Sequence, residues 1–189
     1  IAGGDVLNLI NHILAVGISQ RTAAGAIDEL AKNLFRNPDC EIDPILAFNI
    51  PVSRTFMHLD TIFTQIDFDK FTYHTGIMDT LQVFEITEGD IPDSDEDLNV
   101  KEVNGSLEEI LEKYLGRKIT LIPCAGGEKI SSEREQWNDG TNTLCIAPGV
   151  VVVYDRNNIT NNILREHGIK VFEMSSAELS RGRGGPRCM

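Results

Sequence analysis

Apolar residues in the first part of the chain form two short runs followed by a helical pattern. The runs cover residues 6–10 and 13–18, and the two polar residues between them match the length of a β-hairpin turn. After Thr22, which suits a helix N-cap, apolar side chains recur at three- and four-residue spacing over residues 23–35. An extended apolar segment at 44–51 follows. The pattern predicts a unit of two strands, a helix and a third strand.

The same order of elements is expected twice more along the chain. The second unit has expected strands at 57–66, 70–73, 81–86 and 119–123, an exposed acidic loop at 87–104, and a helix at 106–117 that begins with a capping box of Ser106 and Glu109. The third unit has expected strands at 143–147, 150–154 and 169–172 and a helix at 160–167. The three modules correspond roughly to residues 1–54, 55–124 and 125–189.

Repetition of one supersecondary unit favours an array of modules around an axis, within a single α/β domain. A doubly wound parallel sheet is the competing architecture, and the hydrophobic pattern does not separate the two. The chain has 189 residues, of which 41% are hydrophobic and 24% are charged, so it can bury a sizeable core.

The charge balance narrows the classes of partner. Asp and Glu number 29 against 17 Lys and Arg, which gives a formal net charge of −12. This excess disfavours general nucleic-acid binding and docking on an anionic membrane, and it is compatible with a cationic small molecule. The sequence shows no apolar run near the ~20 residues of a membrane span, no signal-peptide pattern and no ligand-like spacing of cysteines or histidines. We therefore expect a cytoplasmic protein with reduced thiols and no bound metal.

Two segments carry candidate chemistry. His58 and Asp60 lie two residues apart in an expected strand, so both side chains point to one face. They are either an exposed pair at a strand edge or a general acid/base beside a carboxylate that binds a cation. Cys188 follows an Arg- and Gly-rich run, and it is either an ordinary thiol in a flexible tail or a thiol whose pKa the arginines lower. Arg21, at the start of the expected helix, could hold a carboxylate, whereas Asp5 is interpreted as a turn residue.

Several motifs together resemble the arginine deiminase family, in the family's order and over essentially the whole chain. They are Gly3-Gly4-Asp5-Val6, residues 17–22 (GISQRT), 56–61 (FMHLDT), 137–142 (WNDGTN) and 146–150 (IAPGV), and residues 179–189, which contain the run GRGGPRCM. The resemblance implies an α/β propeller of the pentein type, of which this chain holds about three of five strand–strand–helix–strand modules. It also implies that the chain is the C-terminal part of the family's sequence.

The family reaction is hydrolysis of L-arginine to L-citrulline and ammonia, with no metal or cofactor. Carried over by motif, Cys188 is the nucleophile that attacks the guanidinium carbon, and His58 is the general acid/base. The resemblance assigns Asp60 to the guanidinium nitrogens, Arg21 to the α-carboxylate of the substrate, and Arg183 to gating or binding near the nucleophile. The implied partners are free L-arginine and either the missing N-terminal half of the family's chain or a second copy of this one.

Two departures from the family pattern lower the activity expected of this chain alone. Ala2 stands where the family has a Glu that contacts the guanidinium, and a charged hydrogen bond of that kind is worth about 1.5–3 kcal/mol. The chain also begins without Met and ends one residue after Cys188, so both ends look internal and the N-terminal half is missing. The alternative function is a non-catalytic remnant that acts as an interaction module. Agmatine or methylated arginine are rival substrates, against which Arg21 favours a substrate with an α-carboxylate.

Overall fold

The computed structural model describes the chain except for residues 11, 54–55, 78–80, 91–96, 183 and 189. The described residues form two compact units, and each unit is assembled from two stretches of the chain. The first unit comprises Ile1–Leu59 and Thr80–Gly116, and the second comprises Asp60–Asp79 and Arg117–Met189.

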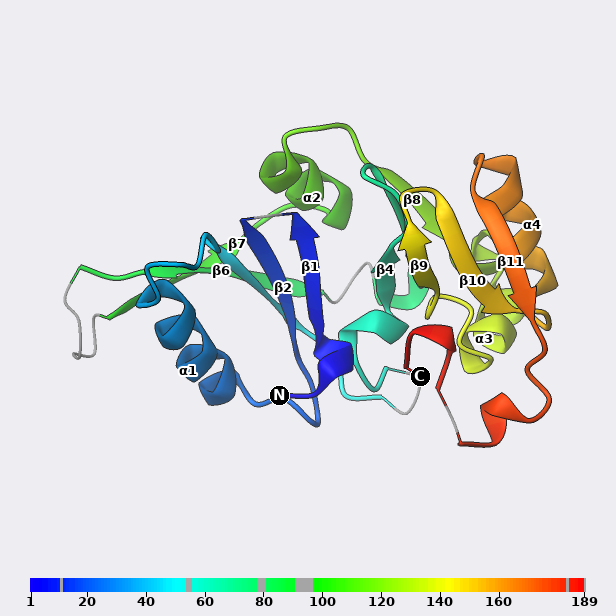
Figure 1. Ribbon diagram of the computed structural model, residues 1–189, viewed down its shortest axis with the longest axis horizontal. Helices are drawn as coiled ribbons and strands as arrows, with labels where there is room; N and C mark the ends of the chain where they lie inside the picture. Colours follow the sequence, from blue (N-terminus) through cyan, green and yellow to red (C-terminus); the bar gives the residue numbers. More distant parts are fainter. Residues whose placement is uncertain (11, 54–55, 78–80, 91–96, 183, 189) are drawn as a thin grey trace. The chain divides into compact units, whose positions relative to one another are not determined.

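The first unit contains a five-stranded sheet in the order β1-β2-β3-β6-β7 (Figure 1). Its strands are β1 (Val6–Ile10), β2 (Ile13–Ile18), β3 (Ile45–Asn49), β6 (Gln82–Glu88) and β7 (Leu98–Val103). β1 and β2 form the expected antiparallel hairpin, and β3 runs parallel to β2 after helix α1 (Ala24–Phe35). The first predicted strand–strand–helix–strand unit is therefore confirmed.

Helix α1 packs against this sheet and closes the core of the first unit. Ile27 and Ala31 of α1 are at most 1% exposed and cluster with Val16, Ala47 and Ile86 of the strands. The helical spacing places the two α1 residues on one stripe of the helix, and alternation along each strand directs one set of side chains toward that stripe. Removal of this apolar surface from water stabilises the unit.

The N-terminal cap predicted from the sequence is confirmed for one helix and wrong for α1. Helix α2 (Leu107–Leu115) begins with the predicted capping box, in which Ser106 and Glu109 each accept a hydrogen bond from the other's backbone N–H. The prediction of Thr22 as the N-cap of α1 is wrong, because the cap is the next residue. The Thr22 hydroxyl instead donates to the buried Asp5 carboxylate at 2.7 Å.

The second unit contains two three-stranded sheets built to the same plan. One has the order β4-β5-β8, and the other has the order β11-β10-β9. Their strands are β4 (Phe63–Gln65), β5 (Lys70–Tyr73), β8 (Thr120–Pro123), β9 (Leu144–Ala147), β10 (Val150–Tyr154) and β11 (Lys170–Met174), and helix α4 (Asn158–Glu166) connects β10 to β11. In each sheet the first two strands are antiparallel and the third runs parallel to the second. The strand order predicted for the third module is confirmed. In the second module the predicted strand at 81–86 is β6, which belongs to the sheet of the first unit, so the order predicted for that module is confirmed only for β4, β5 and β8.

The core of the second unit lies where these two sheets and α4 meet. Val151 and Val153 of β10 are buried on one face of their sheet and cluster with Leu164 of α4. Ile66 and Ile122, from the β4-β5-β8 region, complete the same cluster. Alternation along β10 explains this choice, since successive strand residues point to opposite faces.

Two predicted elements are wrong. Residues 57–66 do not form one strand, because a bend leads into a 3₁₀ turn at Leu59–Thr61 and β4 begins only at Phe63. His58 and Asp60 therefore do not share a strand face. Residues 87–104 are not a loop throughout, because β6 extends to Glu88 and β7 pairs with it antiparallel. The side chains of β7 are mostly exposed, so the strand lacks the apolar alternation that would have indicated it.

Helix α3 (Lys129–Trp137) has no counterpart among the predicted elements. Its residues are mostly polar, and two of its buried side chains are Glu135 and Gln136, so no apolar stripe indicates it. Its N-cap is Glu128, whose carboxylate accepts from the first backbone N–H groups of the helix. Across the described part of the chain, we find no helix both long and apolar enough to cross a membrane.

Candidate active site

Cys188 lies in a short 3₁₀ turn, Pro186–Cys188. Its backbone N–H donates to the Gly185 carbonyl at 3.0 Å. Its Sγ lies 3.4 Å from Asn142 Oδ1 and 3.9 Å from Asp60 Oδ2. The structure thus brings together two of the residues predicted for catalysis, Cys188 and Asp60, from distant parts of the sequence.

Asp60 holds an ion pair in this region. Its side chain is 1% exposed, and its Oδ2 accepts from Arg187 Nη1 at 2.7 Å. A buried carboxylate is costly unless a cation or several donors compensate it, so the guanidinium of Arg187 stabilises the charged form. Arg187 had no predicted role of its own, and its place beside Cys188 in the sequence was the available signal. The pair shows that Asp60 can accept a guanidinium.

Carboxylates dominate the electrostatics around the thiol. The sulfur is partly enclosed although the residue reaches the surface, and this burial raises the pKa of Cys188. The Asp60 charge raises the pKa further and Asp139 adds to the effect, whereas the contacts with the Gly185 backbone and the Asn142 side chain lower the pKa only in part. The prediction that neighbouring arginines lower this pKa is wrong. Of the arginines in this run that the structure describes, Arg187 directs its guanidinium to Asp60 and Arg181 directs its guanidinium to Glu178.

Asp139 is a second carboxyl group with a shifted pKa. Burial and the charge of Asp60 raise its pKa to about 6, and Arg156 opposes the rise. Its φ is 60°, in the left-handed region that few residues other than Gly, Asn and Asp adopt. The Asp139 carbonyl accepts from the Asn142 N–H at 3.0 Å, which closes a turn after α3. This turn places Asn142 next to Cys188.

The segment that leads to Cys188 is fastened to the end of β10. Tyr154 Oη donates to the Gly184 carbonyl at 2.9 Å, and Arg156 Nε donates to Ser176 Oγ at 2.6 Å. Gly184 has a φ of 111°, and a Cβ there would lie 2.8 Å from the Cβ of Cys188. Only glycine fits this position without strain. Two hydrogen bonds and the glycine at position 184 therefore define the path of the segment that leads to Cys188.

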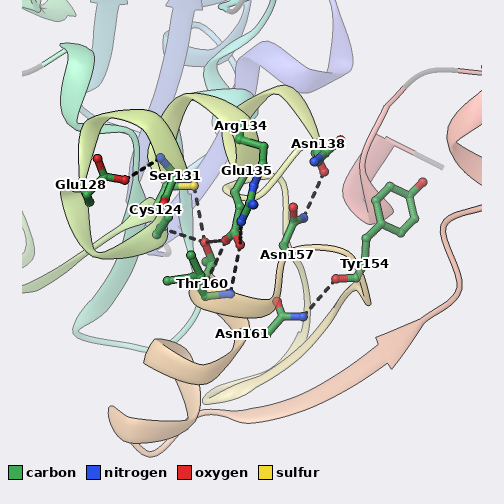
Figure 2. A network of polar contacts seen from close by, with 12 residues as sticks. Cys124, Glu128, Ser131, Arg134, Glu135, Asn138, Tyr154, Asn157, Thr160 and Asn161 are labelled. Carbon is green, nitrogen blue, oxygen red and sulfur yellow. Dashed lines mark hydrogen bonds and ion pairs between the residues drawn. The ribbon is translucent and has the colours of Figure 1, made fainter.

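A buried carboxylate joins α3 to α4 (Figure 2). Glu135 is fully buried, its Oε1 accepts from the Ile159 N–H at 3.0 Å, and its Oε2 accepts from the N–H and hydroxyl of Thr160 at 2.8 and 2.6 Å. Asn157, the N-cap of α4, makes no capping bond, so Glu135 satisfies the helix N-terminus instead. Burial raises the pKa of Cys124 in the same network to about 12, which makes it an inert core thiol.

His58 and Arg21 belong to the first unit. His58 is half-buried in the bend before the 3₁₀ turn, and the Arg21 side chain is exposed. The backbone N–H of Arg21 donates to Ser19 Oγ at 3.1 Å. Their placement opposite Cys188 stays a prediction. Arg183 lies outside the described residues.

Asp5 organises the backbone on which both of these residues lie. It is fully buried, and its Oδ2 accepts from the hydroxyls of Ser19 and Thr22, each at 2.7 Å. Its Oδ1 accepts from the Leu59 N–H at 2.9 Å. Asp5 thus ties the segment of Arg21 to the residue that follows His58. The interpretation of Asp5 as a mere turn residue missed this role, which its position between two glycines and a buried strand could have suggested.

The arrangement in the second unit suits nucleophilic attack on a cationic carbon. A thiol lies beside a buried carboxylate that already binds one guanidinium. No cluster of three or more His, Cys, Asp or Glu side chains with the geometry of a metal site occurs among the described residues. All four cysteines of the chain are free.

Comparison with solved structures shows the fold. The N-terminal domain of ArgZ bound to product, an arginine dihydrolase from the ornithine-ammonia cycle in cyanobacteria, superposes with a TM-score of 0.62 at 18% identity, over 99% of this chain and 54% of that domain. The amidinotransferase StrB1 from Streptomyces griseus gives 0.60 at 15% identity, over 98% of this chain and 44% of its own. The pentein-type α/β fold implied by the resemblance is confirmed.

Comparison with sequences shows the family. The family model for arginine deiminase matches residues 1–189. Arginine deiminases from Treponema denticola, Clostridium perfringens and Staphylococcus aureus are 61%, 57% and 51% identical, over at least 99% of this chain. The chain spans 45–46% of the length of these relatives, and its assignment to their C-terminal part stays a prediction. On this match, which covers every motif from Gly-Gly-Asp to Cys-Met, the chain belongs to the arginine deiminase family.

Proposed function

We propose that this chain provides the nucleophile and part of the substrate pocket for hydrolysis of L-arginine to L-citrulline and ammonia. The observation that carries the proposal is the approach of the Cys188 thiol to within 3.9 Å of the buried Asp60 carboxylate. A pocket for free arginine needs an anionic group for the guanidinium and a nucleophile beside its central carbon. Cys188 and Asp60 supply these two groups.

The Asp60–Arg187 pair supports the binding step. The guanidinium of Arg187 lies 2.7 Å from Asp60 Oδ2, where the guanidinium of a substrate would find the same partner. Substrate must therefore displace Arg187 from Asp60. Because the substrate guanidinium then lies directly against the sulfur that attacks it, binding lowers the pKa of Cys188 and favours the thiolate.

The chemistry follows in two balanced halves. The Cys188 thiol passes its proton to His58, and the thiolate forms a C–S bond to the guanidinium carbon. His58 returns the proton to one nitrogen, the C–N bond breaks and ammonia leaves. His58 then takes a proton from water as the water oxygen bonds to the same carbon. The C–S bond breaks as the new hydroxyl group gives its proton to the released ammonia, which forms ammonium, and the carbonyl of citrulline forms. His58 returns its proton to the thiolate, and citrulline leaves.

The remaining residues complete the proposal. Arg21 binds the α-carboxylate of L-arginine and Arg183 binds the substrate near the nucleophile, and no metal or cofactor takes part. The other half of the family's chain, or a second copy of this one, supplies further substrate contacts. A cytoplasmic location suits the mechanism because a reducing environment keeps Cys188 as a free thiol. Competition among arginine, agmatine and dimethylarginine tests the role of Arg21.

The deciding experiment measures citrulline formed from L-arginine. We expect little turnover by this chain alone, because the relatives are about twice its length and Ala2 replaces a family carboxylate. Addition of the remaining part of the Treponema denticola relative should raise turnover, and Cys188→Ser should abolish it. Cys40→Ser, which changes a thiol of the first unit, is the matched control and should have no effect. Turnover that survives Cys188→Ser would contradict the proposal.

One observation favours the non-catalytic alternative. In this structure the raised pKa of Cys188 keeps the thiol protonated, and Arg187 occupies Asp60. An interaction module that descends from the enzyme would retain both features. It predicts no citrulline even after complementation, and it predicts that added L-arginine does not accelerate alkylation of Cys188. Arginine-dependent acceleration would instead support the enzyme.

A further inference from the structure

Asn142 lies between the two segments that carry the reactive groups. Its Nδ2 donates to the Asp60 carbonyl at 3.3 Å, on the 3₁₀ turn that holds the Asp60 carboxylate. Its Oδ1 accepts from the Arg187 N–H at 3.1 Å and lies 3.4 Å from Cys188 Sγ. One amide side chain therefore contacts both segments at once. Because Oδ1 also accepts from a backbone N–H, the amide oxygen is the atom that faces the thiol.

The surroundings of Asn142 leave it little freedom. The residue is 0% exposed, and its backbone N–H is held by the Asp139 carbonyl at 3.0 Å. Gly185 packs directly on it, since a Cβ at that position would lie 2.5 Å from Asn142 Oδ1 and 2.7 Å from its Cβ. The neighbouring Thr141 hydroxyl donates to the Thr61 carbonyl at 2.6 Å. A fixed side chain with satisfied hydrogen bonds on both sides sets distances between its partners.

We propose that Asn142 is the positioning residue that holds the Cys188 thiol against the Asp60 carboxylate. The inference rests on the proposed function, because it matters for catalysis only if Cys188 and Asp60 act on arginine. Asn142 contacts no reacting carbon itself. It acts by fixing the turn of Asp60 through Nδ2 and the turn of Cys188 through Oδ1. The amide oxygen also accepts from the S–H, which directs the sulfur.

The charged and titratable groups around Cys188 allow a test that needs no substrate. Asp60 and Asp139 face the thiol, Tyr154 lies in the same region, and Arg187 is the adjacent residue. The rate of Cys188 alkylation by iodoacetamide follows the thiolate fraction. Its midpoint against pH therefore reports how close the thiol lies to these carboxylates.

Two substitutions at one position should move this midpoint in opposite directions. Asn142→Ala releases the thiol from Asp60, whose effect on the pKa of Cys188 is larger than that of the Asn142 contact itself, so the midpoint should fall toward that of an ordinary thiol. Asn142→Asp keeps the shape but places a negative charge about where Oδ1 stands, so the midpoint should rise by about one pH unit. A residue with a merely structural role would not give shifts of opposite sign. Peptide mapping separates Cys188 from Cys40, whose rate is the internal reference.

Asn157 provides the matched control. It is 2% exposed in the same unit, and its Nδ2 donates to the Asn138 carbonyl at 3.0 Å. Asn157→Ala and Asn157→Asp should leave the Cys188 midpoint unchanged. If the Asn142 variants fail to fold by circular dichroism, Gly185→Ala displaces the same amide from the other side and should lower the midpoint as Asn142→Ala does.

An unchanged midpoint in folded Asn142 variants, or shifts of the same sign, would overturn the inference, and so would an unchanged midpoint in Gly185→Ala. Alkylation involves neither arginine nor turnover. If only the proposed function is wrong, no citrulline forms, but the pH midpoints of Cys188 alkylation still shift as predicted.

Discussion

At the scale of the residue, Asp60 determines the electrostatics of the site. It is the largest charged contribution to the raised pKa of Cys188, and it also raises the pKa of Asp139. Two carboxylates and a thiol that lie together cannot all carry negative charge without cost. A bound cation relieves this cost, so the site is disposed toward a positively charged ligand. Arg187 fills that role in the structure.

Asp60→Asn should therefore activate the free thiol while it removes substrate binding. Loss of the carboxylate lowers the pKa of Cys188, so a larger fraction is thiolate at any pH below that pKa. Alkylation near neutral pH should accelerate, by about tenfold for each unit by which the pKa falls. Asp69→Asn, which neutralises a more exposed carboxylate of the same unit, should leave the rate unchanged. A slower rate in Asp60→Asn would mean that the ion pair with Arg187, not the charge on Asp60, controls the thiol.

The residues that the sequence could identify were those with distinctive chemistry. His58, Asp60 and Cys188 were candidates because their motifs contain groups used in catalysis, but the pattern alone left an ordinary structural reading open, and the family resemblance assigned their roles. Asp5, Asn142 and the Arg187 pair did not stand out, because their roles come from partners 14 to 127 positions away. Such distant residues become neighbours only when the chain folds.

At the scale of the element, amphipathic segments were predictable and polar ones were not. Helices α1 and α2 show apolar periodicity that matches the face they bury, and strands β2 and β3 are short apolar runs in which nearly every residue is buried. Helix α3 and strand β7 lack that periodicity, because polar contacts hold α3 and the side chains of β7 are mostly exposed. Apolar periodicity indicates which face of an element is buried. It therefore does not indicate elements that are held in place by hydrogen bonds.

Helix α3 should consequently depend on its buried carboxylate. Glu135→Ala leaves the N–H groups of Ile159 and Thr160 without their acceptor at the start of α4, and Thr160 is 1% exposed, so water does not readily replace the lost carboxylate there. We expect a loss of about 3 kcal/mol or more in the free energy of unfolding, measured by urea denaturation. Glu133→Ala, at an exposed position of the same helix, should change it by less than about 0.5 kcal/mol. Equal effects from the two variants would refute the capping role.

At the scale of the whole molecule, repetition was the most reliable information in the sequence. Each of three sheets pairs two antiparallel strands and then adds a third parallel to the second. The middle repeat is the least regular, because β6, β7 and α2 intervene in the chain between β5 and β8. These elements belong to the first unit, whereas β5 and β8 belong to the second. The division into two units was not predictable, since strand pairing across long separations leaves no local pattern.

Each unit has an apolar core of its own, so each should lose protection separately when that core is weakened. Leu164→Ala removes a fully buried side chain from the second core, and Ile27→Ala does the same in the first. Each cavity should cost about 2–5 kcal/mol. In native-state hydrogen exchange, Leu164→Ala should lower amide protection mainly in β10 and β11, and Ile27→Ala mainly in β2 and β3. Equal loss across all these strands in both variants would show that the chain opens as one cooperative unit.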